Sequence, residues 1–164
     1  MELLDLGCNE IEEIPTSIGN LRSLKEFWMD LNQINKIPAE IGDLKNLKYL
    51  ELSENMIEIL PDEISGCISL TDLNLAQNSL DFLPSSIGNL VSLNILKLEQ
   101  NQLVVLTSNI GNCSNLVELV LTENLLSELP KSIGNLKSLT NLNLDRNRLK
   151  NLPNEVCNFP NFYA

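Results

Sequence analysis

Histidine is absent from the 164-residue sequence, and aromatic residues are scarce, with one Trp, two Tyr and four Phe. The chain therefore lacks the commonest general base and the commonest metal ligand of proteins. No run of about 18 apolar residues occurs, so no transmembrane segment is predicted. Residues 1–13 lack a basic region followed by an apolar stretch, and we do not expect them to form a signal peptide.

Positive charge is also scarce, because 11 basic residues face 22 acidic ones and give a net charge of −11. This sign is wrong for gripping a phosphate backbone, which argues against nucleic-acid binding. Glu51 and Glu54 could in principle act as an acid–base pair, yet nothing in the pattern removes them from solvent. No phosphate-binding loop, nucleophile elbow or zinc-protease motif is present. We expect no enzymatic activity, no cofactor and no metal site.

Leucine and asparagine are abundant, with 34 Leu and 23 Asn, and they recur with a fixed period of 23 residues. The unit reads LxxLxLxxNxIxxLPxxIGxLxx, and Thr107 is the one break in its proline position. The asparagines that hold the same position in every unit are Asn9, Asn32, Asn55, Asn78, Asn101, Asn124 and Asn147.

Seven copies of this unit fill residues 1–161, at 1–23, 24–46, 47–69, 70–92, 93–115, 116–138 and 139–161. Residues 162–164 read as the start of a truncated eighth repeat. Repeat arrays need capping sequences at both ends, and neither end shows one. We therefore expect the chain to come from the interior of a longer array, as a fragment or a truncated gene product.

This unit is the leucine-rich repeat, and it predicts an α/β solenoid. In Leu73-Asn74-Leu75 the alternation is that of a strand with both leucines inward and Asn74 outward. One such strand cannot bury its apolar side alone, so the copies should stack into a parallel sheet on the concave face of an arc. The LPxxIG stretch leaves little room for a regular helix, which predicts short 3₁₀ or irregular segments on the convex face.

The asparagine that recurs in every repeat comes directly after the predicted strand, where the chain turns inward. A buried Asn there can donate hydrogen bonds to backbone carbonyls that the turn leaves unpaired. We expect the seven asparagines to form a structural ladder.

The cysteines fit this frame as buried apolar residues rather than as disulfides. Cys67 and Cys113 hold one repeat position two repeats apart, about 10 Å, which exceeds disulfide reach. They stand where other repeats have Leu. Four free thiols without Cys-rich caps favour a reducing, intracellular setting.

A partner is expected on the outward strand positions of the concave face. Trp28 is the one Trp, it replaces no core Leu, and Tyr49 stands on the neighbouring strand. Residues 1–69 hold 14 acidic and 5 basic residues, which favours a basic partner segment. Such an aromatic pair among acids is typical of an interaction hot spot, although Trp28 lying flat as a structural residue is the alternative. The candidate binding residues are Trp28, Asp30, Tyr49, Glu51, Glu54, Asn74 and Lys97.

Several stretches resemble successive repeats of the Scribble and Erbin family, among them LDLGCNEIEEIP, LELSENMIEILP, LVLTENLLSELPKSIGNL and LTNLNLDRNRL, the last two looking especially like Scribble. The resemblance covers all seven repeats. It implies a non-enzymatic scaffold of apical–basal polarity at the cytoplasmic face of the basolateral membrane and at cell junctions, with membrane association through protein partners. The PDZ domains that many members carry are not in this sequence.

Other families share the same frame. A scaffold of the Ras–kinase pathway, or a plant Ras-group repeat protein, is the first alternative. The repeat half of a larger ligase or kinase is an alternative of another class, and a receptor ectodomain is a third. A domain downstream of the repeats would separate them.

Overall fold

The fold was determined as a computed structural model, which describes residues 1–159. Seven three-residue strands form one parallel sheet in the order β1 to β7. Each strand is followed by a five-residue 3₁₀ helix, η1 to η7. The strands are Leu3–Asp5, Glu26–Trp28, Tyr49–Glu51, Asp72–Asn74, Ile95–Lys97, Glu118–Val120 and Asn141–Asn143; the helices are Thr16–Asn20, Ala39–Asp43, Asp62–Gly66, Ser85–Asn89, Ser108–Asn112, Lys131–Asn135 and Asn154–Asn158.

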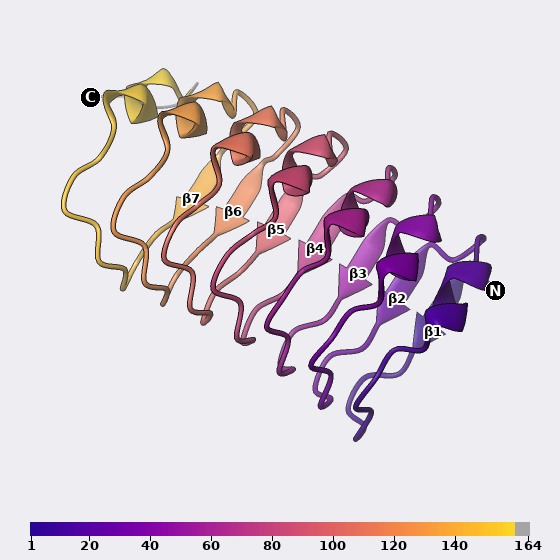
Figure 1. Cartoon of the computed structure of the whole chain (residues 1–164). Coiled ribbons are helices and arrows are strands. Elements are labelled where there is room, and N and C mark those ends of the chain that lie inside the picture. Colours follow the sequence, from indigo (N-terminus) through magenta and orange to yellow (C-terminus); the bar gives the residue numbers. More distant parts are fainter. Residues whose placement is uncertain (160–164) are drawn as a thin grey trace.

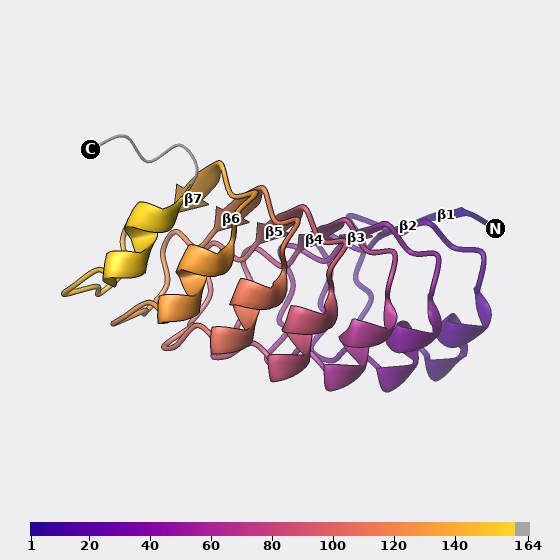
Figure 2. The ribbon, with the colours of Figure 1, turned by 90° about the horizontal axis from the view of Figure 1, so that it is seen from above.

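The molecule is an open stack of these units, as the sequence predicts. Figure 1 shows the seven strands side by side, and Figure 2 shows the strands along one side of the stack with the 3₁₀ helices along the other. The strand register is the same in all six strand pairs, with partners 23 residues apart. Leu50 of β3, for example, pairs with Phe27 of β2 and Leu73 of β4. The leucine-rich-repeat solenoid with a parallel sheet and 3₁₀ turns is confirmed. No helix of the described residues is long and apolar enough to cross a membrane.

The hydrophobic core runs through the stack between the strands and the 3₁₀ helices. Leu73 and Leu75 on either side of Asn74 are fully buried, as the alternation predicts. Ile64 and Ile87 of the 3₁₀ helices meet them from the opposite side as members of the same core cluster. Because each repeat buries its apolar side only against its neighbours, the outermost repeats remain open, and Leu4, Leu6 and Leu152 are partly or fully exposed where their interior equivalents are buried.

The helical side packs too closely for a side chain at the repeat's glycine. A Cβ on Gly111 would lie closer to the backbone oxygen of Ser132 in the next repeat than van der Waals contact permits. The third repeat has Ser65 at this position, and its glycine comes one residue later, where a Cβ on Gly66 would collide with the backbone oxygen of Gly42. The glycine position thus keeps neighbouring backbones in contact, even where the pattern is displaced by one residue.

A side-chain amide joins every repeat to the one before it. In the fourth repeat, Asn78 Nδ2 donates to the carbonyl oxygens of Leu52 (2.9 Å), Leu75 (3.2 Å) and Ala76 (3.1 Å). Its Oδ1 also accepts from the backbone N–H of Ile57 in the third repeat at 2.9 Å. The same four contacts recur in the neighbouring repeats, and the asparagines from Asn32 to Asn124 are buried. The acceptor half of this pattern was not part of the sequence prediction.

The first repeat shows what this arrangement depends on. Asn9 has no preceding repeat in the described structure, is exposed, and donates only to the carbonyls of Leu6 and Gly7 in its own repeat. The last asparagine, Asn147, retains the inter-repeat bonds to Leu121 and Leu126 but is only half-buried.

The turn before each ladder asparagine has a left-handed backbone, which the sequence analysis did not predict. The residue at this position has φ between 51° and 57° in all seven repeats, and none is glycine. A side chain with a Cβ in this region costs roughly 1–2 kcal/mol, and the asparagine bonds on either side hold the turn in place. The residues are Cys8, Leu31, Glu54, Gln77, Gln100, Glu123 and Arg146.

The buried cysteines occupy core positions, as predicted from the repeat frame. Cys67 and Cys113 are fully buried, and their thiols donate to the carbonyl oxygens of Ile41 (3.1 Å) and Ile87 (3.4 Å) of the preceding repeats. Burial raises the pKa of Cys67 from 9.0 to about 12 and that of Cys113 to about 11. Cys8 and Cys157 are exposed, and all four are free thiols.

Replacement of Asn78 by Ala should lower the free energy of unfolding by about 1–3 kcal/mol, because buried backbone groups of two repeats lose their partners. Asn9→Ala is the matched control and should cost clearly less, since Asn9 is exposed and bonds only within its own repeat. Urea unfolding followed by circular dichroism measures both. Equal losses would show that the inter-repeat bonds contribute nothing beyond the local turn.

Thr107→Pro should stabilise the chain by about 0.4–1 kcal/mol, because proline reduces the freedom of the unfolded chain without straining the fold. Thr107 already has φ −57°, close to the −71° to −62° of the prolines at this position in the other six repeats. The backbone N–H of Thr107 donates no hydrogen bond among the described residues. Its Oγ1 accepts from the N–H of Asn109 only at the long distance of 3.4 Å. A lower melting temperature in calorimetry would contradict this account.

At pH 8 the native chain should react with iodoacetamide at Cys8 and Cys157 and spare Cys67 and Cys113. A raised pKa leaves less of the reactive thiolate at a given pH, and the rise from 9.0 to about 12 lowers it about a thousandfold at Cys67. Mass spectrometry should count two labels before unfolding in urea and four after it. Four labels on the folded protein would show that the core cysteines are accessible.

Candidate protein-binding surface

Each strand directs two side chains outward, from its first and from its last residue. Register places the last residues in a single row across the sheet, so that Trp28 lies beside Asp5 on one side and Glu51 on the other. The full row is Asp5, Trp28, Glu51, Asn74, Lys97, Val120 and Asn143.

Two aromatic side chains stand out on this face. Trp28 is 36% exposed and Tyr49 is 42% exposed, although both belong to strands whose central residues, Phe27 and Leu50, are buried. Because Trp28 pairs with Glu51, and Tyr49 begins the same strand as Glu51, the two rings are diagonal neighbours on adjacent strands. They lie at one end of a shallow hollow of about 230 Å³ across β2 to β5.

The hollow brings together five of the seven candidate residues. Trp28, Tyr49, Glu51, Asn74 and Lys97 line it. Asp30 and Glu54 do not. Glu54 belongs to the left-handed turn beyond β3, and Asp30 follows the end of β2, so their part in binding stays a prediction. Asp72 and Ile95 line the hollow as well, and they complete its wall on β4 and β5.

Polar contacts fix the floor of the hollow. Asn74 Nδ2 donates to Glu51 Oε2 at 2.8 Å, and Glu51 Oε1 accepts from the backbone N–H of Ser53 at 3.0 Å. Asn74 Oδ1 in turn accepts from the N–H of Ala76 at 3.0 Å. These two side chains therefore hold each other and their own strand ends, which makes them positioning residues more than open ligands.

Charge of both signs remains on the walls. The Asp72 carboxylate accepts a hydrogen bond from Thr71 Oγ1 at 2.6 Å and has no cationic partner among residues 1–159. Lys97 forms no ion pair within that same range. The hollow thus offers aromatic surface, the carboxylates of Glu51 and Asp72 and the ammonium group of Lys97.

Several side chains of the outward row accept hydrogen bonds from backbone amides. In four repeats the side chain at the end of the strand accepts from the N–H two residues later, as Asp5 does for Gly7 and Asn143 for Asp145. Trp28, Lys97 and Val120 cannot accept, and the amides of Asp30, Glu99 and Thr122 have no acceptor in the described part of the chain. The sequence analysis missed this pattern, although Asp or Asn two residues before a turn is its usual signal.

Two buried polar atoms stand next to these free amides. Glu99 Oε2 and Thr122 Oγ1 have no hydrogen-bond partner, and they occupy equivalent positions of consecutive repeats. Buried polar atoms without partners are costly. These two oxygen atoms are enclosed by the protein and are not open to a partner.

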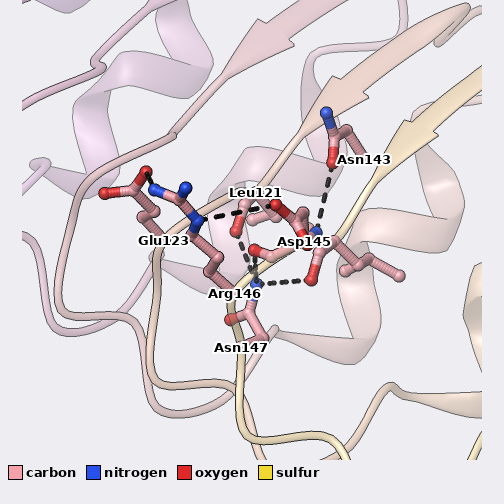
Figure 3. A network of polar contacts seen from close by, with 7 residues as sticks. Leu121, Glu123, Asn143, Asp145, Arg146 and Asn147 are labelled. Atoms are coloured by element: carbon pink, nitrogen blue, oxygen red, sulfur yellow. Dashed lines mark hydrogen bonds and ion pairs between the residues drawn. The ribbon is translucent and has the colours of Figure 1, made fainter.

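At the C-terminal end of the strand face the charges are already paired. Arg146 Nη1 bonds Glu123 Oε1 of the preceding repeat at 2.6 Å, and Arg146 Nε lies 3.8 Å from Asp145 Oδ2. Figure 3 shows this network beside the ladder bond from Asn147 to Leu121. Arg146 is 70% exposed, so the pair contributes little to stability.

Catalytic chemistry finds no support in this geometry. Within residues 1–159 no group of three His, Cys, Asp or Glu could hold a metal ion. The ionisable side chains of the hollow, Glu51, Asp72 and Lys97, line a shallow surface depression.

Family models match two parts of the chain. A leucine-rich-repeat model matches residues 29–80, and a second leucine-rich-repeat model matches residues 138–159. No curated protein matches the chain significantly. Nothing in these matches singles out the Scribble and Erbin family.

Solved structures show the same architecture. An LRR protein of Leptospira interrogans is 36% identical, with a TM-score of 0.73, over 98% of this chain and 47% of that protein. An internalin from Listeria monocytogenes is 26% identical, with a TM-score of 0.83, over 100% of this chain and 48% of that one. A plant peptide hormone receptor, RGFR1 in complex with RGF2, is 28% identical, with a TM-score of 0.65, over 93% and 29%.

The chain therefore spans less than half the length of each of these proteins. The period, the sheet and the two family matches agree, and they identify the chain as an array of leucine-rich repeats.

Proposed function

We propose that this chain is a non-enzymatic protein-interaction scaffold, and that the hollow on its strand face binds a segment of a partner protein. The observation that carries the proposal is the exposed pair Trp28 and Tyr49 at one end of a hollow that five outward side chains complete. Large aromatic side chains at the centre of an interface typically supply most of its binding energy.

The chemistry of the hollow describes the segment. An apolar side chain of the partner would cover the rings of Trp28 and Tyr49. A Lys or Arg next to it would meet Asp72, and an acidic or carbonyl group would meet Lys97.

The solved relatives support binding as the activity of this fold. One of them is a plant peptide hormone receptor in complex with RGF2. A parallel sheet with two outward side chains per repeat presents two long rows of positions that can vary without disturbing the core, and repeat proteins bind along such extended surfaces.

We further propose the cellular setting that the sequence resemblance implies, a Scribble-type polarity scaffold at the cytoplasmic face of the basolateral membrane and at cell junctions. The support is the likeness of the repeat sequences and the four free cysteines, which suit a reducing compartment. A Ras-pathway or plant Ras-group scaffold uses the same frame and is the alternative in the same class. The repeat half of a ligase or kinase is the alternative in another class.

Trp28→Ala should weaken a bound peptide by about 30-fold, which corresponds to about 2 kcal/mol. The probe is a peptide selected against the wild-type chain from a displayed library, measured by fluorescence anisotropy. Val120→Ala is the matched control, because Val120 holds the same row position on β6 and does not line the hollow. It should leave the affinity unchanged.

Unfolding in urea separates a binding role from a structural one. If Trp28→Ala also lowers the free energy of unfolding by more than about 1 kcal/mol, Trp28 is part of the packing. Full affinity in Trp28→Ala places the binding surface elsewhere. Junctional localisation of the full-length protein in epithelial cells tests the polarity setting separately, and a diffuse distribution would contradict it.

A further inference from the structure

A second exposed surface lies on the flank of the stack, away from the strand face. At the residue two places before the repeat's proline, three consecutive repeats carry large apolar side chains: Ile59, Phe82 and Val105. Their exposed fractions are 57%, 47% and 53%. The equivalent residues of the neighbouring repeats are charged, Lys36 before the stripe and Glu128 after it, so the apolar stripe has defined ends.

The backbone holds these side chains in line. Lys36 and Ile59 form a parallel bridge, and the N–H of Val104 donates to the carbonyl oxygen of Asp81 at 3.3 Å. Hydrogen-bonded neighbouring segments lie about 4.8 Å apart, so the three side chains form a stripe about 10 Å long that runs along the stack. An open groove of about 420 Å³, lined by Lys36, Glu58, Ile59 and Pro61 among others, adjoins the first of them.

The spacing decides the shape of the occupant. An α-helix rises 1.5 Å per residue, so apolar residues at i, i+4 and i+7 span about 10.5 Å, close to the length of the stripe. Same-face residues of an extended strand are about 6.6 Å apart and would fall out of step by the third repeat. A helix laid along the stack fits this flank, and a strand does not.

The charge around the stripe decides the chemistry. Glu58 and Asp81 precede Ile59 and Phe82 in the chain and are exposed. A second groove, on the other side of Lys36, is lined by Glu12, Glu13 and Glu40. A second copy would place the same acidic groups against these, which opposes self-association, whereas a basic segment would meet charges of opposite sign.

We propose that this flank, defined by Ile59, Phe82 and Val105, is a second docking surface that binds a basic amphipathic helix of a partner protein. The helix lies along the stack with its apolar face on the stripe and its Lys or Arg side chains over Glu58 and Asp81. This surface is separate from the hollow around Trp28 and does not depend on the function proposed for that hollow. A scaffold with both could hold two partners at once.

The test uses a synthetic 15-residue helical peptide with Leu at i, i+4, i+7 and i+11 and with Ala and Lys elsewhere. Fluorescence anisotropy measures its binding to the wild-type chain and to Phe82→Glu. The control is Val91→Glu, which changes an apolar residue of the same repeat that is 54% exposed on another edge. An isomeric peptide, with the same composition but its Leu residues spread around the helix, controls for general attraction to an acidic protein.

Phe82→Glu should weaken the amphipathic peptide at least tenfold, while Val91→Glu and Trp28→Ala should leave it unchanged. The added negative charge can only favour a basic peptide, so a loss reports the apolar contact. Equal binding of the two peptides, or equal effects of the two Glu substitutions, would overturn the proposal. So would light scattering that shows a wild-type dimer and a Phe82→Glu monomer, because the flank would then be a contact between copies of the chain.

Discussion

The hydrogen bonds of one asparagine side chain per repeat are the constraint on which the rest of this structure depends. Asn78 reaches the carbonyl of Leu52 and the amide of Ile57, so a single buried amide ties the turn of one repeat to two points of the preceding one. Backbone bonds also join the repeats, such as those from the N–H of Leu52 to Asn74 and from the N–H of Ser79 to Ile57, but they leave other backbone groups of the turn to the asparagine side chain. Because the side chain satisfies backbone groups that the turn would otherwise bury unpaired, the chain can turn sharply inward every 23 residues.

This internal fixing leaves the outward positions free to vary. Residues such as Trp28 and Val120 occupy the same structural position without contributing to the core, so they can differ from repeat to repeat without disturbing the fold. The flank follows the same logic, because Phe82 and Glu128 stand at equivalent points of repeats that are otherwise alike. A surface of this kind can carry two separate docking sites on one rigid stack.

Periodicity explains why the fold was predictable from the sequence and why the site was predictable only in part. The inward alternation of Leu73 and Leu75 follows from their spacing, and the burial of Cys67 follows from its place in the frame. Which outward side chains lie together was harder to predict from the sequence, because it depends on the geometry of several neighbouring repeats. Glu54 lies in a left-handed turn and does not line the hollow, whereas Asp72 does.

The most direct test of the account is amide hydrogen exchange, measured by NMR on the wild-type chain and on a variant that lacks a single ladder side chain. If the asparagine couples each repeat to the one before it, Asn78→Ala should accelerate exchange of the Ile57 amide, which donates to Asn78 Oδ1. The Leu103 amide, which donates to Asn124 Oδ1 two repeats further on, should stay as protected as in the wild type. Unchanged protection at Ile57 would contradict the account.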